Sequence, residues 1–236
     1  MTLPVAVLVS GTGSNLQALI AQIDAGRIDA RIAAVISNKA DAPALDRAKR
    51  HGIPTRALPH GDFPDRAAFD AALLAAIQGS GAQAVVLAGF MRLLAPECIA
   101  AFRNRILNIH PALLPSFPGI RGQADAAAYG VTIAGATVHF VDEKMDNGPS
   151  IIQAAVPATP DDDAQSLAAR ILAMEHRIYP QALAWLAADR LRVEGRKVRL
   201  LPAEGNVMET SMGAGTGERG EGAGRWLVNP PLEAGF

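Results

Sequence analysis

Hydrophobic and polar positions in the first half of the chain follow the pattern of strands joined by helices. Short uncharged runs, such as residues 5–9 and 84–88, are typical of strands buried on both faces of a sheet. Between them, apolar residues recur every three or four positions, as on one face of a helix. The pattern predicts strands at 5–9, 31–37, 54–58 and 84–88, and helices at 16–25, 43–51, 65–78 and 96–102.

The second half of the chain is less regular. A strand predicted at 106–109 runs into Pro111, and strands predicted at 136–141 and 151–156 lie too close together for a helical crossover. A helix is predicted over 164–188, and a hairpin that turns at Gly195 follows. We therefore expect an α/β, Rossmann-like fold with a mostly parallel central sheet, helices on both faces and an antiparallel C-terminal part.

Composition and charge narrow the class of protein. The chain has 236 residues, 50% of them hydrophobic, which is enough for a folded core. A net charge of -1 provides no excess of cations for a nucleic-acid backbone, so we expect no nucleic-acid partner. Two long stretches of the chain contain no charged residue, but polar residues interrupt each of them. We therefore expect no membrane segment. The only cysteine, Cys98, is typical of a reducing compartment and predicts a cytoplasmic location.

A glycine-rich loop, residues 10–15, lies between the first predicted strand and helix. Its backbone amides and the positive end of the helix dipole favour a phosphate. The sixth position of a dinucleotide fingerprint is Leu16, and the second strand ends in Ser37, Asn38 and Lys39 without the acidic residue that would bind a ribose, so NAD is disfavoured. The alternative is a tight turn that needs glycine for its backbone geometry.

Two polar residues mark the end of the strand at 106–109. Asn108 and His110 are two positions apart and therefore emerge on the same face, while Pro111 stops the strand. An amide donor beside an imidazole suits acyl transfer to nitrogen, because the pair can bind an oxyanion and pass a proton. A histidine with a purely structural role is the alternative reading.

An acidic loop follows the next strand and closes with Asn147, Gly148 and Pro149. This turn holds Asp146 in place, and a carboxylate near His110 would orient the imidazole and favour its charged form. For Asp142 and Glu143 a solvated loop is an adequate explanation. The five histidines include no pair at metal-ligand spacing, so no metal site is expected.

Taken together, these motifs resemble the folate-dependent formyltransferase family, and within it the branch that formylates glycinamide ribonucleotide. The resemblance covers roughly residues 5–201. It rests on the order of six segments, namely SGTGSNLQ at 10–17, SNK at 37–39, VLAGFMR at 86–92, NIHPALLP at 108–115, TVHFVDEKMDNGP at 137–149 and EHRIYP at 175–180.

The resemblance implies direct transfer of a formyl group from 10-formyltetrahydrofolate to the amine of glycinamide ribonucleotide, through a tetrahedral intermediate, in purine synthesis. Asn108 would bind the formyl oxygen, His110 would act as the charged donor or general acid, and Asp146 would assist proton relay. The implied ribonucleotide contacts are Gly13, Ser14, Asn15 and Glu175. The implied folate contacts are Arg66, Met91, Arg92, Leu93, Leu94, Asp142, Glu143, Lys144 and Met145.

The resemblance also implies a division of the chain. We expect a catalytic domain at 1–202, with a phosphate-binding half at 1–104 and a catalytic and folate-binding half at 105–202. Eight of the 34 residues from 203 to 236 are glycine and no apolar periodicity is present, so this tail is expected to be disordered. The segment 120–123 departs from the pattern of many family members, which carry histidine at the position of Arg121 or Gln123.

Some other functions would explain part of the same set of motifs. A formyltetrahydrofolate deformylase would share the Asn, His and Asp set, and a relative that formylates transfer RNA would need a basic surface. An NADP-binding reductase could use the glycine-rich loop with Lys39 but would leave Asn108 and His110 without a role. A non-catalytic nucleotide-binding module is the remaining alternative. The expected partners are small-molecule substrates, bound by a monomer or a homodimer.

Overall fold

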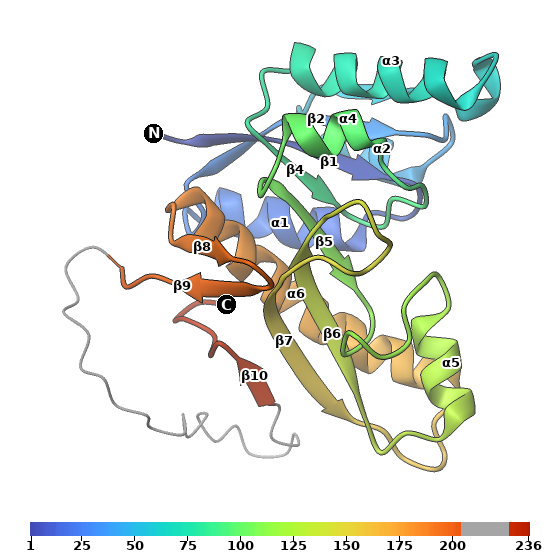
Figure 1. Ribbon diagram of the computed structural model, residues 1–236, viewed down its shortest axis with the longest axis vertical. Coiled ribbons are helices and arrows are strands. Elements are labelled where there is room, and N and C mark those ends of the chain that lie inside the picture. Colours follow the sequence, from blue (N-terminus) through green and yellow to red (C-terminus); the bar gives the residue numbers. More distant parts are fainter. Residues whose placement is uncertain (204–226) are drawn as a thin grey trace.

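The structure, a computed structural model, describes residues 1–203 and 227–236 (Figure 1). The strands of its main sheet are β1 (Leu3–Val9), β2 (Ala30–Ser37), β3 (Thr55–Ala57), β4 (Ala84–Leu87), β5 (Ile106–His110), β6 (Ile133–Phe140), β7 (Ser150–Pro157) and β10 (Leu227–Asn229). The helices are α1 (Ser14–Asp24), α2 (Pro43–Arg50), α3 (Arg66–Gly79), α4 (Pro96–Ala101), α5 (Gly122–Tyr129) and α6 (Ala164–Ala187), with a 3-10 turn η1 (His60–Asp62). A hairpin of β8 (Leu191–Glu194) and β9 (Lys197–Leu200) forms a separate two-stranded sheet.

The main sheet has a parallel and an antiparallel half, as the spacing of the strands predicts. Its order is β10-β7-β6-β5-β4-β1-β2-β3. The pairs from β3 to β5 are parallel, whereas β6, β7 and β10 are each antiparallel to their neighbours. β5 is therefore the strand at which the direction changes.

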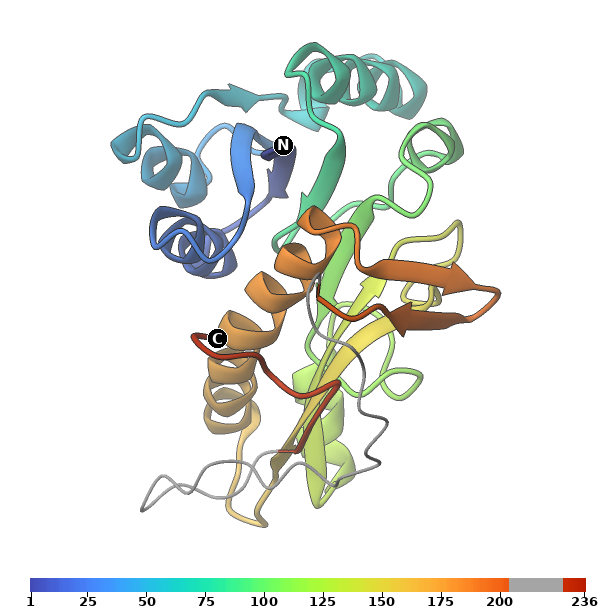
Figure 2. The same ribbon diagram turned by 90° about the vertical axis from the view of Figure 1, so that its left-hand side faces the viewer.

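Helices cover both faces of the parallel half. Because side chains alternate along a strand, Val5 and Val7 of β1 contribute to one hydrophobic cluster, with α1, α2 and α6, while Ala6 and Leu8 contribute to the other, with α3 and α4. Figure 2 shows α1 and α6 on one side of the sheet, and α3, α4 and the β8–β9 hairpin on the other. No helix in the described part of the chain is long and apolar enough to cross a membrane.

Two elements differ from the predictions. The helix α5 lies in a segment without a clear pattern, because only Gly122 and Ala126 of this alanine-rich helix are buried. The expectation of disorder for 203–236 is wrong for residues 227–236, which include β10, whereas 204–226 lie outside the described residues. Because glycine is frequent in the tail as a whole, its average composition does not indicate the short apolar segment at its end.

Tyr179 of α6 offers a test of how the helix is attached to the sheet. Its fully buried hydroxyl lies 3.0 Å from the carbonyl oxygens of both Leu87 and Leu107. We expect Tyr179→Phe to reduce the free energy of unfolding by about 1–3 kcal/mol, because the two buried carbonyls lose the one hydroxyl proton that they share. Urea unfolding followed by circular dichroism measures the change. The matched control Tyr129→Phe, at an exposed side chain, should change stability by less than about 0.5 kcal/mol. Equal effects would contradict the role of the hydroxyl.

Candidate active site

Most of the polar residues singled out in the sequence gather at the carboxyl ends of the parallel strands. β1 ends just before the glycine-rich loop, and β5 ends at His110 on the other side of β4. Neighbouring strands are about 4.8 Å apart, so the ends of β1 and β5 are about 10 Å apart. The strand order reverses between β1 and β4, and such points are where open α/β sheets form ligand-binding crevices.

The glycine-rich loop leads directly into α1. Gly13 precedes the helix with φ at 76°, and a Cβ there would lie 2.7 Å from the Cβ of Ala44, so this close approach of α2 requires glycine. No side chain caps the helix and its first turn carries no acidic residue. The first amides of α1 are thus available to an anion, which the helix dipole also favours.

Asn15 and Glu175 form a buried polar pair behind this helix end. The Asn15 Nδ2 donates to Oε2 of Glu175 at 2.7 Å, although the two residues are 160 positions apart in the chain. Burial raises the pKa of the Glu175 carboxyl above its usual value, and the Asn15 hydrogen bond opposes this in part. The Asn15 Oδ1 is buried and has no hydrogen-bond partner. A buried acceptor without a partner is unusual and indicates a place for a ligand donor.

Asn108 is oriented by His139 of the neighbouring strand. In the antiparallel register, Asn108 lies opposite His139, and the Asn108 Nδ2 is 3.1 Å from His139 Nε2. The His139 Nδ1 donates to the Phe140 carbonyl oxygen at 2.8 Å, so Nε2 of the neutral ring accepts from Asn108. Burial lowers the pKa of His139, which keeps the ring in this neutral form. One of the two Asn108 amide protons is therefore committed and the other is free.

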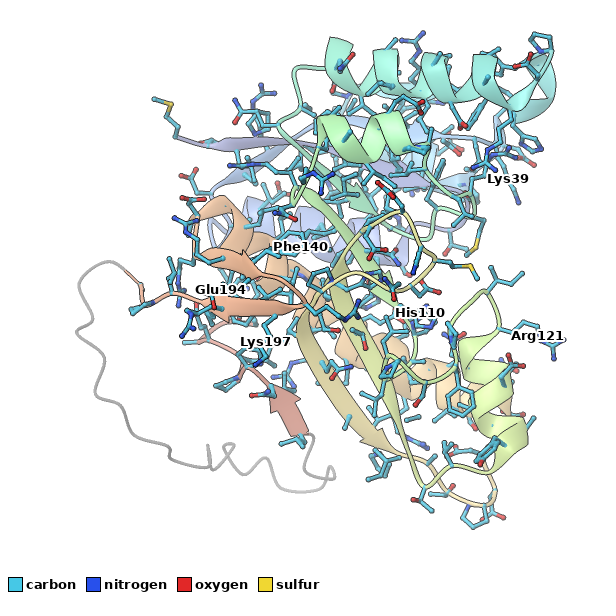
Figure 3. All side chains as sticks on the ribbon, in the orientation of Figure 1. Lys39, His110, Arg121, Phe140, Glu194 and Lys197 are labelled. Atoms are coloured by element: carbon cyan, nitrogen blue, oxygen red, sulfur yellow. The ribbon has the colours of Figure 1, made fainter. Side chains whose placement is uncertain are left out.

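His110 and Asp146 lie side by side. The His110 Nδ1 is 3.4 Å from Asp146 Oδ2, and its Nε2 donates to the Phe117 carbonyl oxygen at 2.8 Å. Asp146 Oδ2 also accepts from the Gly119 amide at 2.7 Å. The segment 117–119 thus closes over both side chains. Figure 3 shows His110 among the central strands, whereas Arg121 points outward from the same loop region.

A second set of buried groups supports the segment after His110. Thr137, opposite His110 in the register, donates from Oγ1 to the Ala112 carbonyl and accepts from the Leu114 amide. The Gln153 Nε2 of β7 donates to both Thr137 Oγ1 and the Leu114 carbonyl, each at 2.9 Å. The antiparallel strands therefore hold the chain where it leaves β5.

The acidic loop between β6 and β7 is held by hydrogen bonds within the loop and by one from the β8–β9 turn. Asp142 accepts from the Lys144 amide with one oxygen and from the Asn147 side chain with the other. Arg196 of the β8–β9 turn donates to the Asn147 carbonyl at 2.8 Å. Asp146, at φ of 50°, lies in the left-handed region between these anchors. The carboxylate thus faces the histidines because its loop is fixed on both sides.

The side chains predicted to contact folate lie in two groups. Met91, Leu93 and Met145 are large apolar side chains that remain exposed in loops beyond the ends of β4 and β6. Arg66 pairs with Asp70, Arg92 lies 4.9 Å above the ring of Phe69, and Leu94 is buried. No contact brings these arginines to His110.

A cavity of about 380 Å³ lies against the acidic loop. Its walls include the predicted residues Asp142, Glu143 and Lys144, but also residues from the end of α4 that the sequence does not single out. The complete lining is Ile99, Arg103, Asn104, Phe140, Val141, Asp142, Glu143, Lys144, Asn147 and Pro149. Within residues 1–203 and 227–236, no three His, Cys, Asp or Glu side chains are grouped as a metal site.

His139 and Thr137 are the site residues that sequence reasoning missed. Both belong to a strand that was predicted, and their two-residue spacing is the same as that of Asn108 and His110. The signal in the sequence is a pair of alternating polar residues on each of two successive strands. Its meaning depends on the register of β5 against β6, which only the structure provides.

Comparison with known proteins gives a consistent result. The Formyl transferase family matches residues 3–183. The chain is 43% identical to phosphoribosylglycinamide formyltransferase of Escherichia coli strain K12 over 189 residues, which is 80% of this chain and 89% of that protein. It is similar in structure to glycinamide ribonucleotide transformylase 1 of Symbiobacterium toebii, with a TM-score of 0.84, 50% identity, and coverage of 85% of this chain and 95% of that one.

The chain also resembles part of a larger protein. It is 48% identical over 190 residues to the trifunctional purine biosynthetic protein adenosine-3 of Drosophila pseudoobscura pseudoobscura. The match covers 80% of this chain but only 14% of that protein. The chain therefore spans a small part of the length of this trifunctional relative.

The neutral state of His139 has a measurable consequence for stability. Its pKa is lowered by burial, so on acidification below about 6.5 the unfolded chain binds a proton that the folded chain does not. This contribution destabilises the fold as the pH falls, and it is absent in His139→Gln. We expect the difference in unfolding free energy between the native chain and the variant to shrink between about pH 8 and about pH 5.5, in urea unfolding.

The exposed His60, which makes no ion pair within the described residues, provides the control for this measurement. His60→Gln should change the unfolding free energy by less than about 0.5 kcal/mol at both pH values. A difference that widens on acidification would mean that the folded protein holds His139 in its charged form.

Proposed function

The chain belongs to the formyl transferase family, and we propose that it transfers the formyl group of 10-formyltetrahydrofolate to the amine of glycinamide ribonucleotide in purine synthesis. One observation carries the proposal. A carboxamide, an imidazole and a carboxylate, from Asn108, His110 and Asp146, come together at the end of β5 beside an uncapped helix end. Moving an acyl group between two nitrogens requires such an oxyanion donor and a group that carries a proton.

Asn108 acts as the oxyanion donor in this proposal. His139 accepts one proton of the Asn108 amide, which fixes the plane of the carboxamide and leaves the second proton for the formyl oxygen. A donor that is already oriented costs no reorganisation as charge develops on that oxygen. The neutral His139 is therefore a positioning residue for Asn108.

His110 and Asp146 would transfer the proton that moves between the attacking amine and the leaving nitrogen. With Nε2 donating to the Phe117 carbonyl, a proton at Nδ1 lies between the imidazole and the carboxylate. A ring protonated at both nitrogens carries a positive charge, which the nearby Asp146 would compensate in a site that is largely shielded from water. The charged ring would give a proton to the leaving nitrogen, and the neutral ring that results would then take up the proton that the attacking amine releases.

The two substrates fit separate parts of the site. The amides at Gly13, Ser14 and Asn15 would hold the phosphate of the ribonucleotide, and Glu175 would contact its remaining polar groups. The formyl-folate supplies the activated one-carbon unit. Its flat, partly apolar ring system would lie against the exposed apolar side chains of Met91, Leu93 and Met145, with Asp142 to Lys144 of the acidic loop as further contacts.

The alternatives explain less of the site. A deformylase would use Asn108, His110 and Asp146 but has no need of a phosphate-binding helix end for an acceptor. In a reductase the end of β2 would face the ribose of NADP, but here the Asn38 side chain is buried and bonded to the Ser10 hydroxyl.

The decisive experiment measures product formation from a formyl-folate donor with and without glycinamide ribonucleotide, by absorbance. We expect turnover only when the ribonucleotide is present. We expect His110→Ala to lower kcat by roughly 10²- to 10⁴-fold, the usual contribution of a general acid or base. The control His51→Ala changes an exposed histidine at the end of α2 and should retain full activity.

The outcomes separate the candidate functions. Turnover that needs no ribonucleotide would indicate a deformylase, and no turnover under either condition would contradict formyl transfer. Activity that survives His110→Ala would remove His110 from the chemistry while leaving the substrate assignment in place.

Asn15→Asp tests the ribonucleotide half of the site. The variant keeps the shape of the side chain but places a negative charge beside Glu175 and the proposed phosphate position. We expect KM for the ribonucleotide to rise roughly 10- to 100-fold, because a donor becomes a repelling acceptor, while KM for the formyl-folate stays within about twofold. Gln22→Glu, near the other end of α1, adds the same charge away from the site and serves as the control. Equal changes in both KM values would contradict the separation of the two subsites.

A further inference from the structure

Residues 227–236 lie against the body of the protein and extend its main sheet (Figure 1). β10 pairs with β7 in antiparallel register, with Leu227 opposite Ala155 and Asn229 opposite Gln153. Without this segment, β7 would be the last strand on its side of the described sheet. The family match ends at residue 183, so the segment lies outside it.

Side chains of α6 and the residues after it anchor the segment. Glu233 Oε1 accepts from the Trp185 indole at 3.0 Å and from Arg190 at 2.7 Å, and the Glu233 amide donates to Gln181 at 2.8 Å. Trp185 and Gln181 are almost completely buried. Buried polar groups of α6 therefore depend on Glu233 for their partners.

Apolar contacts accompany these hydrogen bonds. Val228, Leu232 and Phe236 are half-buried and pack against the cluster that contains α6 and β7. The Phe236 carbonyl accepts from Arg177 at 3.2 Å, which ties the far end of the segment to α6. The segment is thus attached along its whole length, through backbone, polar and apolar contacts.

The edge that β10 covers has a sequence that favours pairing. β7 reads SIIQAAVP and contains no charged residue, and β-branched residues make up three of its eight positions. Proteins usually protect an exposed edge strand with charges, bulges or prolines, because unpaired backbone groups otherwise recruit another strand. β7 has a register shift at Ile151 and a proline, Pro157, at its end, and β10 covers the edge between them, from Gln153 to Ala155.

We propose that residues 227–236 form an edge-covering segment that occupies β7 and the adjoining side of α6, and so prevents this edge from pairing with a second copy of the chain. The occupant is this segment of the same chain, held by Glu233. The proposal concerns the edge of the sheet and not the chemistry at His110, so it does not depend on formyl transfer.

The test releases the segment in the full chain with the double variant Val228→Pro, Glu233→Ala. Proline interrupts the pairing of β10, and alanine removes the acceptor of Trp185 and Arg190. We expect the β7 amides that pair with β10 to exchange hydrogen at least tenfold faster. We also expect the average mass in analytical ultracentrifugation to rise with concentration toward twice that of the native chain. Glu97→Ala, at an exposed position of α4, should match the native chain in both measurements.

Two additions show which surface is responsible. Ala155→Lys in the double variant places a charge on the half-buried edge and should restore the native mass. A synthetic peptide of residues 227–236 should do the same by occupying the edge, and the peptide with Glu233→Ala should bind at least tenfold more weakly. Unchanged exchange in the double variant would show that the segment does not dock. Faster exchange with an unchanged mass would show that the segment does not prevent the edge from pairing. Association that persists with Ala155→Lys would show that the chains associate through another surface.

Discussion

The antiparallel register of β5 against β6 is the constraint on which the site depends. It places His139 opposite Asn108 and Thr137 opposite His110, so each polar residue at the end of β5 meets a polar residue from β6. A shift by one residue would turn all of these side chains to the other face. The register is in turn fixed by the fully apolar residues that alternate with them, Leu107 and Ile109 on one strand and Val138 and Phe140 on the other.

The change of strand direction at β5 divides the site into two regions of different chemistry. On one side, parallel strands bring loops and a helix end to a common edge, which provides open amides and little negative charge. On the other side, antiparallel strands bring buried side chains that satisfy one another, such as Thr137, Gln153 and His139. The first arrangement suits the binding of an anion, and the second holds a proton-carrying pair in a fixed position.

Much of this arrangement can be predicted from the sequence, and the remainder cannot for identifiable reasons. The alternating strands and helices, the antiparallel second half and the shared face of Asn108 and His110 follow from local periodicity, and the structure confirms them. The pairing of Asn15 with Glu175 joins residues 160 positions apart, and no local pattern contains it. His139 was missed because its role depends on register, α5 because an alanine-rich helix has no apolar stripe, and β10 because glycine dominates the composition around it. The roles assigned to individual residues remain predictions, since the fold places them without a substrate.

The two edges of the sheet are protected in different ways, and the difference follows from their sequences. The edge at β3 is only three residues long and carries the exposed Arg56, so little backbone is available to another strand. The edge at β7 is eight residues long and uncharged, and a charge on its inner face would disturb Gln153 and Thr137 beside the site. Covering this edge with β10 avoids that conflict. The new edge is itself short, since Pro230 and Pro231 follow Asn229 and cannot donate to a further strand.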